Sequence, residues 1–106
     1  MRHQLNKLQR GKSTKAERIF MEYLKELHIP FRTKVKIGGR EVDFLIGRYA
    51  IEIDCHDQSV KKNWAIIKEG YFPVHFSNEA VRNKESIKNY LIQIHGRFII
   101  RNKPIH

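Results

Sequence analysis

The most informative segment of the sequence is residues 41–57, EVDFLIGRYAIEIDCHD. Two apolar runs, VDFLI and YAIEI, flank a Gly-Arg dipeptide, and this pattern predicts a β-hairpin with a two-residue loop. Pairing the two strands around that loop brings acidic residues opposite one another, Asp43 to Glu52 and Glu41 to Asp54. Because side chains alternate along a strand, we expect these four carboxylates on one face of the sheet.

A row of four carboxylates needs compensating positive charge, because like charges directly opposed across a sheet destabilise it. Carboxylate oxygens are the ligands that Mg²⁺, Mn²⁺ and Ca²⁺ prefer, so one interpretation of the row is a metal site. The other interpretation is a solvated edge face, whose counter-ions are basic residues of a neighbouring strand: Arg32, Lys34 or Lys36.

The composition is that of one basic globular domain. The chain has 106 residues, 41% of them hydrophobic, and a net charge of +10, which predicts a polyanionic partner, nucleic acid first and an anionic membrane second. The lone cysteine, Cys55, allows neither an internal disulfide nor a multi-cysteine zinc cluster and fits a reducing compartment. No apolar run approaches the roughly 20 residues of a membrane span, and no secretory signal is visible. We therefore expect an intracellular protein that is neither secreted nor held in a membrane.

The segment before the hairpin predicts a helix and a strand. Thr14 and Glu17 have the spacing of a capping box, so a helix is expected to begin at residue 13 or 14 and to end before Pro30. Residues 31–37, FRTKVKI, alternate as a half-buried strand with a basic outer face, and the Gly-Gly pair after them predicts a tight turn.

The segment after the hairpin changes to helical periodicity. We expect a helix capped by Asp57, with Val60, Trp64 and Ile67 toward the core and Lys61, Lys62 and Lys68 outward. A short strand over residues 71–76 follows, placed at a sheet edge by its proline, and then a long helix from Ser77 or Asn78 to Gly96. The last residues, RFIIRNKPIH, are left unassigned, a short strand being one possibility.

The order helix, three strands, helix, strand, helix defines an α/β fold. The third and fourth strands are joined through a helix, so they are expected to be parallel with a right-handed crossover. The predicted architecture is a small mixed sheet, an antiparallel meander of three strands plus a parallel fourth strand, with helices on both faces.

Carboxylate-held metal at the end of a basic sheet suits phosphodiester hydrolysis, because the ion activates a water and stabilises developing charge. His56 lies two residues beyond Asp54 and is a candidate general acid or base, or a nitrogen ligand; the alternative is a strand-end histidine bonded to backbone. His75, on the neighbouring strand, is a secondary candidate. Glu17 has a structural alternative as the partner in the capping box.

These residues, in this order, resemble the PD-(D/E)XK restriction-endonuclease-like nucleases. The resemblance rests on a helix with Glu17, VDFLI with Asp43, and IEID with Glu52 and Asp54, followed by a helix and a strand. Within that superfamily the chain is similar to the very-short-patch-repair (Vsr-like) branch, whose small members have a segment similar to EGYFPVHFSNEAV. The DCHD stretch at residues 54–57 is similar to the D-x-H-D of the EDxHD group of phage intron-encoded homing endonucleases. The resemblance covers about residues 13–82.

The resemblance implies a restriction-endonuclease-like fold and a Mg²⁺- or Mn²⁺-dependent DNA endonuclease. The catalytic residues would be Glu17, Asp43, Glu52, Asp54 and His56, with Asp43, Glu52 and Asp54 as metal ligands. The lysine of the ExK pattern is absent, since Asp54 stands in its place. Proton handling would then fall to His56 or Lys62, with His75 and Asp57 as secondary candidates.

Double-stranded DNA is the expected partner. Basic residues expected to contact it are Lys12, Lys15, Arg32, Lys34, Lys36, Lys61 and Lys62. Residues 1–12 are expected to be a basic arm or linker and residues 13–106 the catalytic domain, with DNA-reading modules and any homodimer contact on DNA outside this chain. The alternatives are a Vsr-like repair or transposition-linked nicking enzyme and a non-catalytic basic DNA-binding module. The last predicts an ordered lysine or arginine bridging Asp43 and Glu52.

Overall fold

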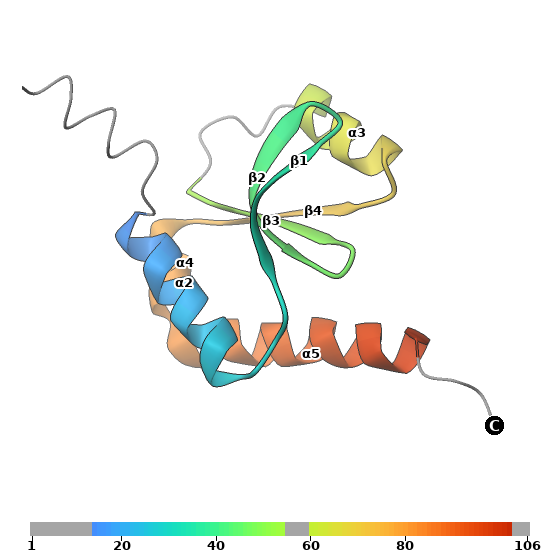
Figure 1. Cartoon of the computed structure of the whole chain (residues 1–106). Helices are drawn as coiled ribbons and strands as arrows, with labels where there is room; N and C mark the ends of the chain where they lie inside the picture. The colour runs from blue at the N-terminus through green and yellow to red at the C-terminus, as the bar shows by residue number, and fades with distance from the viewer. Residues whose placement is uncertain (1–13, 55–59, 103–106) are drawn as a thin grey trace, which may run out of the picture.

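The computed structural model describes residues 14–54 and 60–102, with side chains placed through residue 96. Its elements are α2 (Lys15–Glu26), β1 (Arg32–Ile37), β2 (Arg40–Ile46), β3 (Tyr49–Ile53), α3 (Val60–Lys68), β4 (Phe72–Phe76), α4 (Asn78–Arg82) and α5 (Lys84–Asn102), shown in Figure 1. The predictions for Lys12, Cys55, His56 and Asp57, and for the arm over residues 1–12, lie outside the described residues.

The four described strands form one sheet in the order β1-β2-β3-β4. The pairs β1–β2 and β2–β3 are antiparallel, and β3–β4 is parallel, which confirms the predicted fold class. The hairpin turns at Gly47, which has φ +58°, and its register sets Ile46 opposite Tyr49 and Phe44 opposite Ile51, as predicted. Pro73 lies in β4, an edge strand of this sheet, where its missing amide is tolerated.

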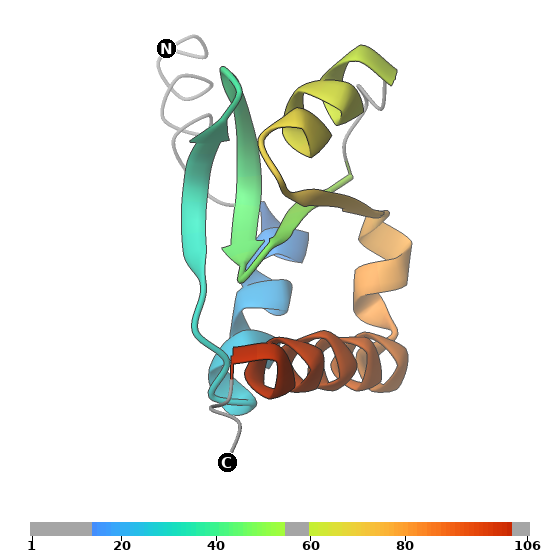
Figure 2. The ribbon, with the colours of Figure 1, turned by 90° about the vertical axis from the view of Figure 1, so that its right-hand side faces the viewer.

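Helices cover both faces of the sheet. The larger core lies between the sheet and α2, α4 and α5, and its largest fully buried side chains include Phe20, Leu24, Phe44, Ile51, Leu91 and Ile94. On the opposite face α3 packs Ile66 against a smaller group formed by Ile37, Val42, Leu45 and Ala50. Figure 2 shows α3 and α5 on opposite sides of the strands. None of the described helices is long and apolar enough to span a bilayer.

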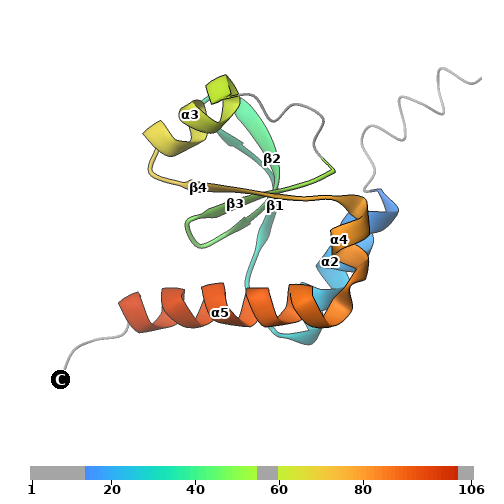
Figure 3. The same ribbon diagram turned by 180° about the vertical axis from the view of Figure 1, so that it is seen from behind.

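The first described helix begins at its predicted capping box. The Thr14 hydroxyl accepts a hydrogen bond from the Glu17 amide at 3.2 Å, and the Thr14 amide donates to Glu17 Oε1 at 3.0 Å. Farther along the helix, the Tyr23 hydroxyl donates to the Val81 carbonyl at 3.0 Å and so links α2 to α4, which is drawn in front of α2 in the view from behind (Figure 3). The capping box therefore fixes where Glu17 sits relative to the sheet.

The prediction of one continuous buried face on β1 was wrong. Phe31 packs against the larger core, whereas Val35 and Ile37 contact the smaller core under α3. The change of side occurs at Lys34, whose φ of +53° lies in the left-handed region that side chains other than glycine rarely adopt. The expected basic outer face is consequently interrupted, because Lys34 no longer lies in one row with Arg32.

The predicted orientation of α3 was also wrong. The three residues expected in the core are exposed: Val60 by 71%, Trp64 by 57% and Ile67 by 45%. Ile66 is instead fully buried, and Lys62 faces the sheet. The reason is the neighbouring strand: β3 presents the buried carboxylate of Glu52 on this face, and a buried carboxylate needs a cation. The helix therefore presents its lysine to the sheet and leaves its more apolar stripe in solvent.

The predicted last helix is divided and longer than expected. Asn83 separates α4 from α5, and its Oδ1 accepts a hydrogen bond from the Ser86 amide at 3.3 Å, as a helix-capping asparagine does. The helix then continues through Gly96 to Asn102, where the sequence predicted an end at Gly96 and a possible strand. A glycine inside a helix costs only about 1 kcal/mol relative to alanine and does not stop it.

The orientation of α3 makes a prediction about stability. Ile66→Ala is expected to lower the free energy of unfolding by about 2–4 kcal/mol, because it opens a cavity under the helix. Trp64→Ala, a larger truncation two residues away, is expected to cost less than about 1 kcal/mol because the indole is mostly in solvent. Urea unfolding of both variants measures the difference. If Trp64→Ala lowered the free energy of unfolding more than Ile66→Ala, the result would instead support the orientation of the helix expected from the sequence.

Candidate functional site

Asp43 lies where β2 separates from β3. Phe44 and Ile51 are the last residues paired between these strands within the described chain, although β3 runs on to Ile53. The Ile53 amide donates instead to Asp43 Oδ2, at 2.8 Å. The carboxylate of Asp43 thus takes the place of the next backbone acceptor and is fixed beside the end of β3.

Two further charged groups meet Asp43. Lys34 Nζ lies 3.5 Å from Asp43 Oδ1 and 3.6 Å from Glu17 Oε1. Lys34 reaches this position from the adjacent strand, flanked by the register pairs Thr33–Phe44 and Val35–Val42. Side chains from α2, β1 and β2 therefore form one cluster of two acids and one lysine, which we call the fork cluster (Glu17, Lys34 and Asp43).

Glu17 is the most buried member of the fork cluster, with 6% of its surface exposed. Burial raises the pKa of its carboxyl above the ordinary value of 4.5, and the charge of Asp43 raises it further. The Thr14 amide and the Lys34 ammonium act in the opposite direction and do not cancel the increase. Glu17 therefore completes the capping box and also lies next to Asp43. A role as cap partner and a role as an acid of the site are compatible.

Glu52 belongs to a second cluster, on the α3 side of the sheet. Its carboxylate is 6% exposed, and Lys62 Nζ lies 2.7 Å from both Oε1 and Oε2. Only the contact with Oε2 has hydrogen-bond geometry, and within the described residues Oε1 accepts no other hydrogen bond. The Lys62 side chain is itself only 11% exposed. This is a close, largely desolvated ion pair.

His75 lies opposite Glu52 in the parallel register of β3 and β4. Its Nε2 is 3.0 Å from Asn63 Oδ1, while its Nδ1 is buried and has no hydrogen-bond partner in the part of the chain described. Glu52, Lys62, Asn63 and His75 together form what we call the α3 cluster. Asn63 was not expected from the sequence, and the only signal for it is its place beside Lys62 and one turn before Ile66.

The predicted row of four in-phase carboxylates is not formed in the described structure. Asp43 joins the fork cluster and Glu52 the α3 cluster, and Glu41 is exposed opposite Lys36 of β1. Asp54 is exposed at the end of β3 with φ +53°. The physical reason is the separation of the strands: once Asp43 bonds the Ile53 amide, the regular pairing that would align the acids ends.

The structure places the predicted basic residues in two different settings. Lys15, Arg32, Lys36 and Lys61 are exposed, as a DNA-contacting surface requires. Lys34 and Lys62 instead face carboxylates. The lysine expected of a non-catalytic module was to bridge Asp43 and Glu52, but in the described structure each of these acids pairs with a lysine of its own.

The metal-binding capacity of the clusters differs. No three His, Cys, Asp or Glu side chains come together as a metal site within residues 14–54 and 60–102. Mg²⁺ commonly takes only one or two protein carboxylates and completes its shell with waters and substrate phosphate. Glu17 and Asp43 supply such a pair, so the fork cluster fits this ion, whereas Glu52 is already closely paired.

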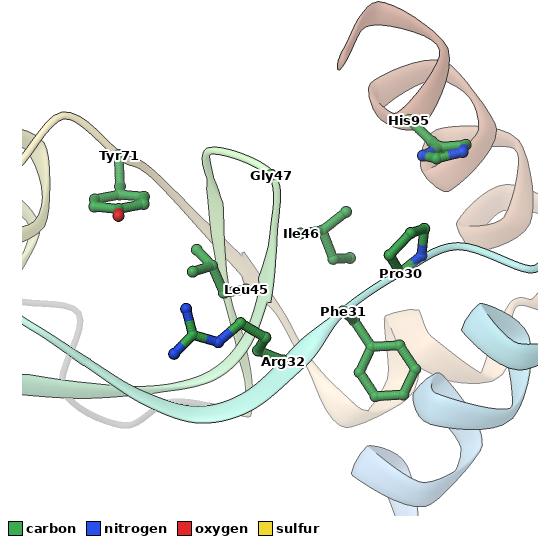
Figure 4. A pocket seen from close by; sticks show the side chains of 8 residues that line it. All are labelled: Pro30, Phe31, Arg32, Leu45, Ile46, Gly47, Tyr71 and His95. Atoms are coloured by element: carbon green, nitrogen blue, oxygen red, sulfur yellow. The ribbon is translucent and has the colours of Figure 1, made fainter. Parts of the chain in front are cut away.

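A cavity of about 380 Å³, whose lining side chains are drawn in Figure 4, shares no lining residue with either cluster. It is lined by Pro30, Phe31, Arg32, Leu45, Ile46, Gly47, Tyr71 and His95. The lining contains no carboxylate and is mainly apolar, so the chemistry expected of the acidic residues does not reside there.

The mixed sheet of three antiparallel strands and one parallel strand, covered by helices on both faces, is a nuclease-like fold. The solved catalytic domain of the homing endonuclease I-Bth0305I is similar to it, with a TM-score of 0.65 and 22% sequence identity over 87% of this chain and 100% of that one. No protein-family model and no curated protein matches the sequence. The structural match confirms the resemblance to a homing-endonuclease catalytic domain at the level of the fold.

The raised pKa of Glu17 predicts a pH dependence of stability. The folded chain retains the Glu17 proton to a higher pH than the unfolded chain, whose carboxyl titrates near 4.5. The stabilisation from this group is thus complete below pH 4.5 and is lost as the pH rises through the folded-state pKa. Glu17→Gln removes the titration yet keeps a residue suited to the capping box.

Urea unfolding of wild type and Glu17→Gln between about pH 4 and 8 tests this dependence. The variant is expected to gain stability relative to wild type as the pH rises above the ordinary carboxyl range. A difference that stays constant, or that grows in favour of wild type, would show that Glu17 is not held in the environment described.

Proposed function

We propose that this chain is a metal-dependent DNA endonuclease catalytic domain that hydrolyses phosphodiester bonds, of the homing-endonuclease type. The observation that carries the proposal is the convergence of Glu17 and Asp43 at the separation of β2 and β3, in a chain of net charge +10. The fold shared with the I-Bth0305I catalytic domain supports it. Membership of the PD-(D/E)XK superfamily, in its Vsr-like branch, is part of the proposal.

Glu17 and Asp43 are the carboxylates best placed to hold Mg²⁺ or Mn²⁺ in the described structure. Asp43 is oriented by the Ile53 amide, so one of its oxygens is fixed while the other faces Lys34. When bound, the ion would supply an activated water and charge stabilisation at phosphorus. Asp54 follows Ile53 directly and is exposed, and we retain it as a proposed ligand from the other strand. Glu52, which the sequence also suggested as a ligand, is proposed instead to hold the Lys62 ammonium in place.

The missing lysine of the ExK pattern has a proposed substitute. Lys62 comes from α3 and holds its ammonium 2.7 Å from Glu52, next to the strand on which the family pattern would place its lysine. As an ammonium it can stabilise a charged phosphate group. His56, two residues beyond Asp54, is the proposed group that moves a proton to or from the attacking water or the leaving oxygen.

Double-stranded DNA is the proposed substrate. The exposed basic residues expected to contact its phosphates are Lys15, Arg32, Lys36 and Lys61, and such contacts give affinity without sequence selection. We propose that residues 13–106 form the catalytic domain and residues 1–12 a basic arm, with sequence reading and any homodimer contact on DNA supplied from outside the chain. A Vsr-like repair or transposition-linked nicking enzyme would use the same residues.

A non-catalytic DNA-binding module is the second candidate. The observation in its favour is that Glu17 and Asp43 share Lys34, and Glu52 has Lys62, so that each of these acids already has a positive partner. Such pairing is what a structural role for the acids requires. Cleavage assays separate the two candidates.

Cleavage of supercoiled plasmid tests the proposed function. Wild type with Mg²⁺ or Mn²⁺ is expected to nick or linearise the plasmid, and EDTA is expected to abolish this. Asp43→Asn and His56→Ala are each expected to lower the rate by about 100-fold or more. Glu41→Gln is the matched control, because Glu41 is an exposed acid two positions along the same strand and should leave the rate unchanged.

Two results would contradict the proposal. If Asp43→Asn and His56→Ala both cut the plasmid at the wild-type rate, the catalytic site lies elsewhere. The second contrary result has two parts. The protein binds DNA equally well with Mg²⁺ and with EDTA, and it does not cut even when a DNA-reading segment is supplied. That result would identify the chain as a binding module.

A further inference from the structure

Lys34 has an unusual backbone conformation for its place in the sheet. Lys34 lies inside β1 and has a φ of +53°, a value at which residues other than glycine are strained. The register of β1 on β2 is the same before and after Lys34: Thr33 pairs with Phe44 and Val35 with Val42, an advance of two residues on each strand. The conformation is therefore not the result of an inserted residue. Its effect is to carry the Lys34 side chain to the α2 side of the sheet.

The Lys34 ammonium is shared by two acids but closely bound by neither. Its distances of 3.5 Å to Asp43 Oδ1 and 3.6 Å to Glu17 Oε1 exceed the 2.7–3.2 Å range usual for N–H···O hydrogen bonds. The side chain is 38% exposed. Lys62, by contrast, lies 2.7 Å from both oxygens of Glu52 and is nearly buried. Of the two lysines, Lys34 is the one that a competing cation can reach and replace.

We propose that Lys34 is the resident cation of the fork cluster, standing between Glu17 and Asp43 until a divalent ion displaces it. The inference rests on the proposed function, because it takes these two carboxylates as the metal-binding pair. An ammonium between two like charges relieves their repulsion, and a divalent ion does so more strongly. The lysine and the ion therefore compete for the same oxygens, and the four-carbon side chain is long enough to swing into solvent.

Removal of the competing ammonium should strengthen metal binding. Mn²⁺ affinity is measured by titration calorimetry for wild type, Lys34→Met and Lys25→Met. Lys25 is an exposed lysine of α2 paired with Glu22, so its replacement changes the net charge equally without touching the fork cluster. Lys34→Met is expected to bind Mn²⁺ about tenfold more tightly than wild type, and Lys25→Met to match wild type. Asp43→Asn added to Lys34→Met should abolish the binding.

A second readout follows the protein without metal. In EDTA the thermal unfolding midpoint of Lys34→Met should lie below that of Lys25→Met, because Glu17 and Asp43 are left facing each other, and Mn²⁺ should close the gap. Lys34→Gly guards against a folding failure, since glycine accepts a positive φ and also removes the ammonium. It is expected to show the same gain in Mn²⁺ affinity.

The outcomes separate this inference from the proposed function. Equal or weaker Mn²⁺ binding by Lys34→Met and Lys34→Gly overturns the role of Lys34, while an Asp43-dependent metal site would remain. Absence of Mn²⁺ binding in wild type and in both Lys34 variants overturns the inference and the metal-dependent function together. Binding that appears only when Lys34 is replaced supports the inference in its strongest form.

Discussion

The hydrogen bond from the Ile53 amide to Asp43 Oδ2 is the contact on which the site depends. An N–H group at the end of an interior strand costs about 1–3 kcal/mol if it is buried without a partner. Asp43 satisfies it with a side chain, so β2 can turn away from β3 without that loss. The same bond fixes a carboxylate at the point of separation. The Asp43 carboxylate therefore both satisfies the backbone at the strand end and belongs to the proposed metal site. Replacing it is expected to affect stability and metal binding together.

The separation of the strands sorts the acids into two electrostatic environments. On the α2 side, Glu17 and Asp43 share a partly exposed Lys34 at long range. On the α3 side, Glu52 is held closely by a nearly buried Lys62. A close, desolvated pair of this kind is costly to break, because it leaves an uncompensated charge behind. The first environment therefore allows one cation to replace another, and the second holds a fixed positive charge.

Local signals predicted the parts of the fold that local signals control. The Gly47 turn fixed the register of the hairpin, and the Thr14–Glu17 capping box fixed the start of α2. The helical connection between β3 and β4 fixed their parallel arrangement. These features depend on turn chemistry, helix capping and chain connectivity, each of which is readable within a few residues.

The features that the sequence did not predict depend on non-local partners. Nothing in the alternating pattern of β1 marks Lys34 as the residue with positive φ, and the acids that its ammonium meets come from α2 and β2, far from it in the sequence. The sequence pattern favoured burial of Trp64 because it is apolar, but Trp64 is exposed. The face of α3 that carries Lys62 packs on the sheet, where Lys62 pairs with the buried Glu52. The alignment of Asp43 with Glu52 was not observed either, because the Asp43 carboxylate bonds the Ile53 amide where the regular strand pairing ends.

We propose that a divalent ion binds at the fork cluster. A crystal of the chain grown with Mn²⁺, with anomalous diffraction recorded at the manganese edge, tests this directly. We expect the strongest anomalous peak between the carboxylates of Glu17 and Asp43, with the Lys34 side chain moved into solvent and Lys62 still paired with Glu52. A peak at Glu52 with Lys62 displaced, or Lys34 unmoved and no peak beside Asp43, would contradict it.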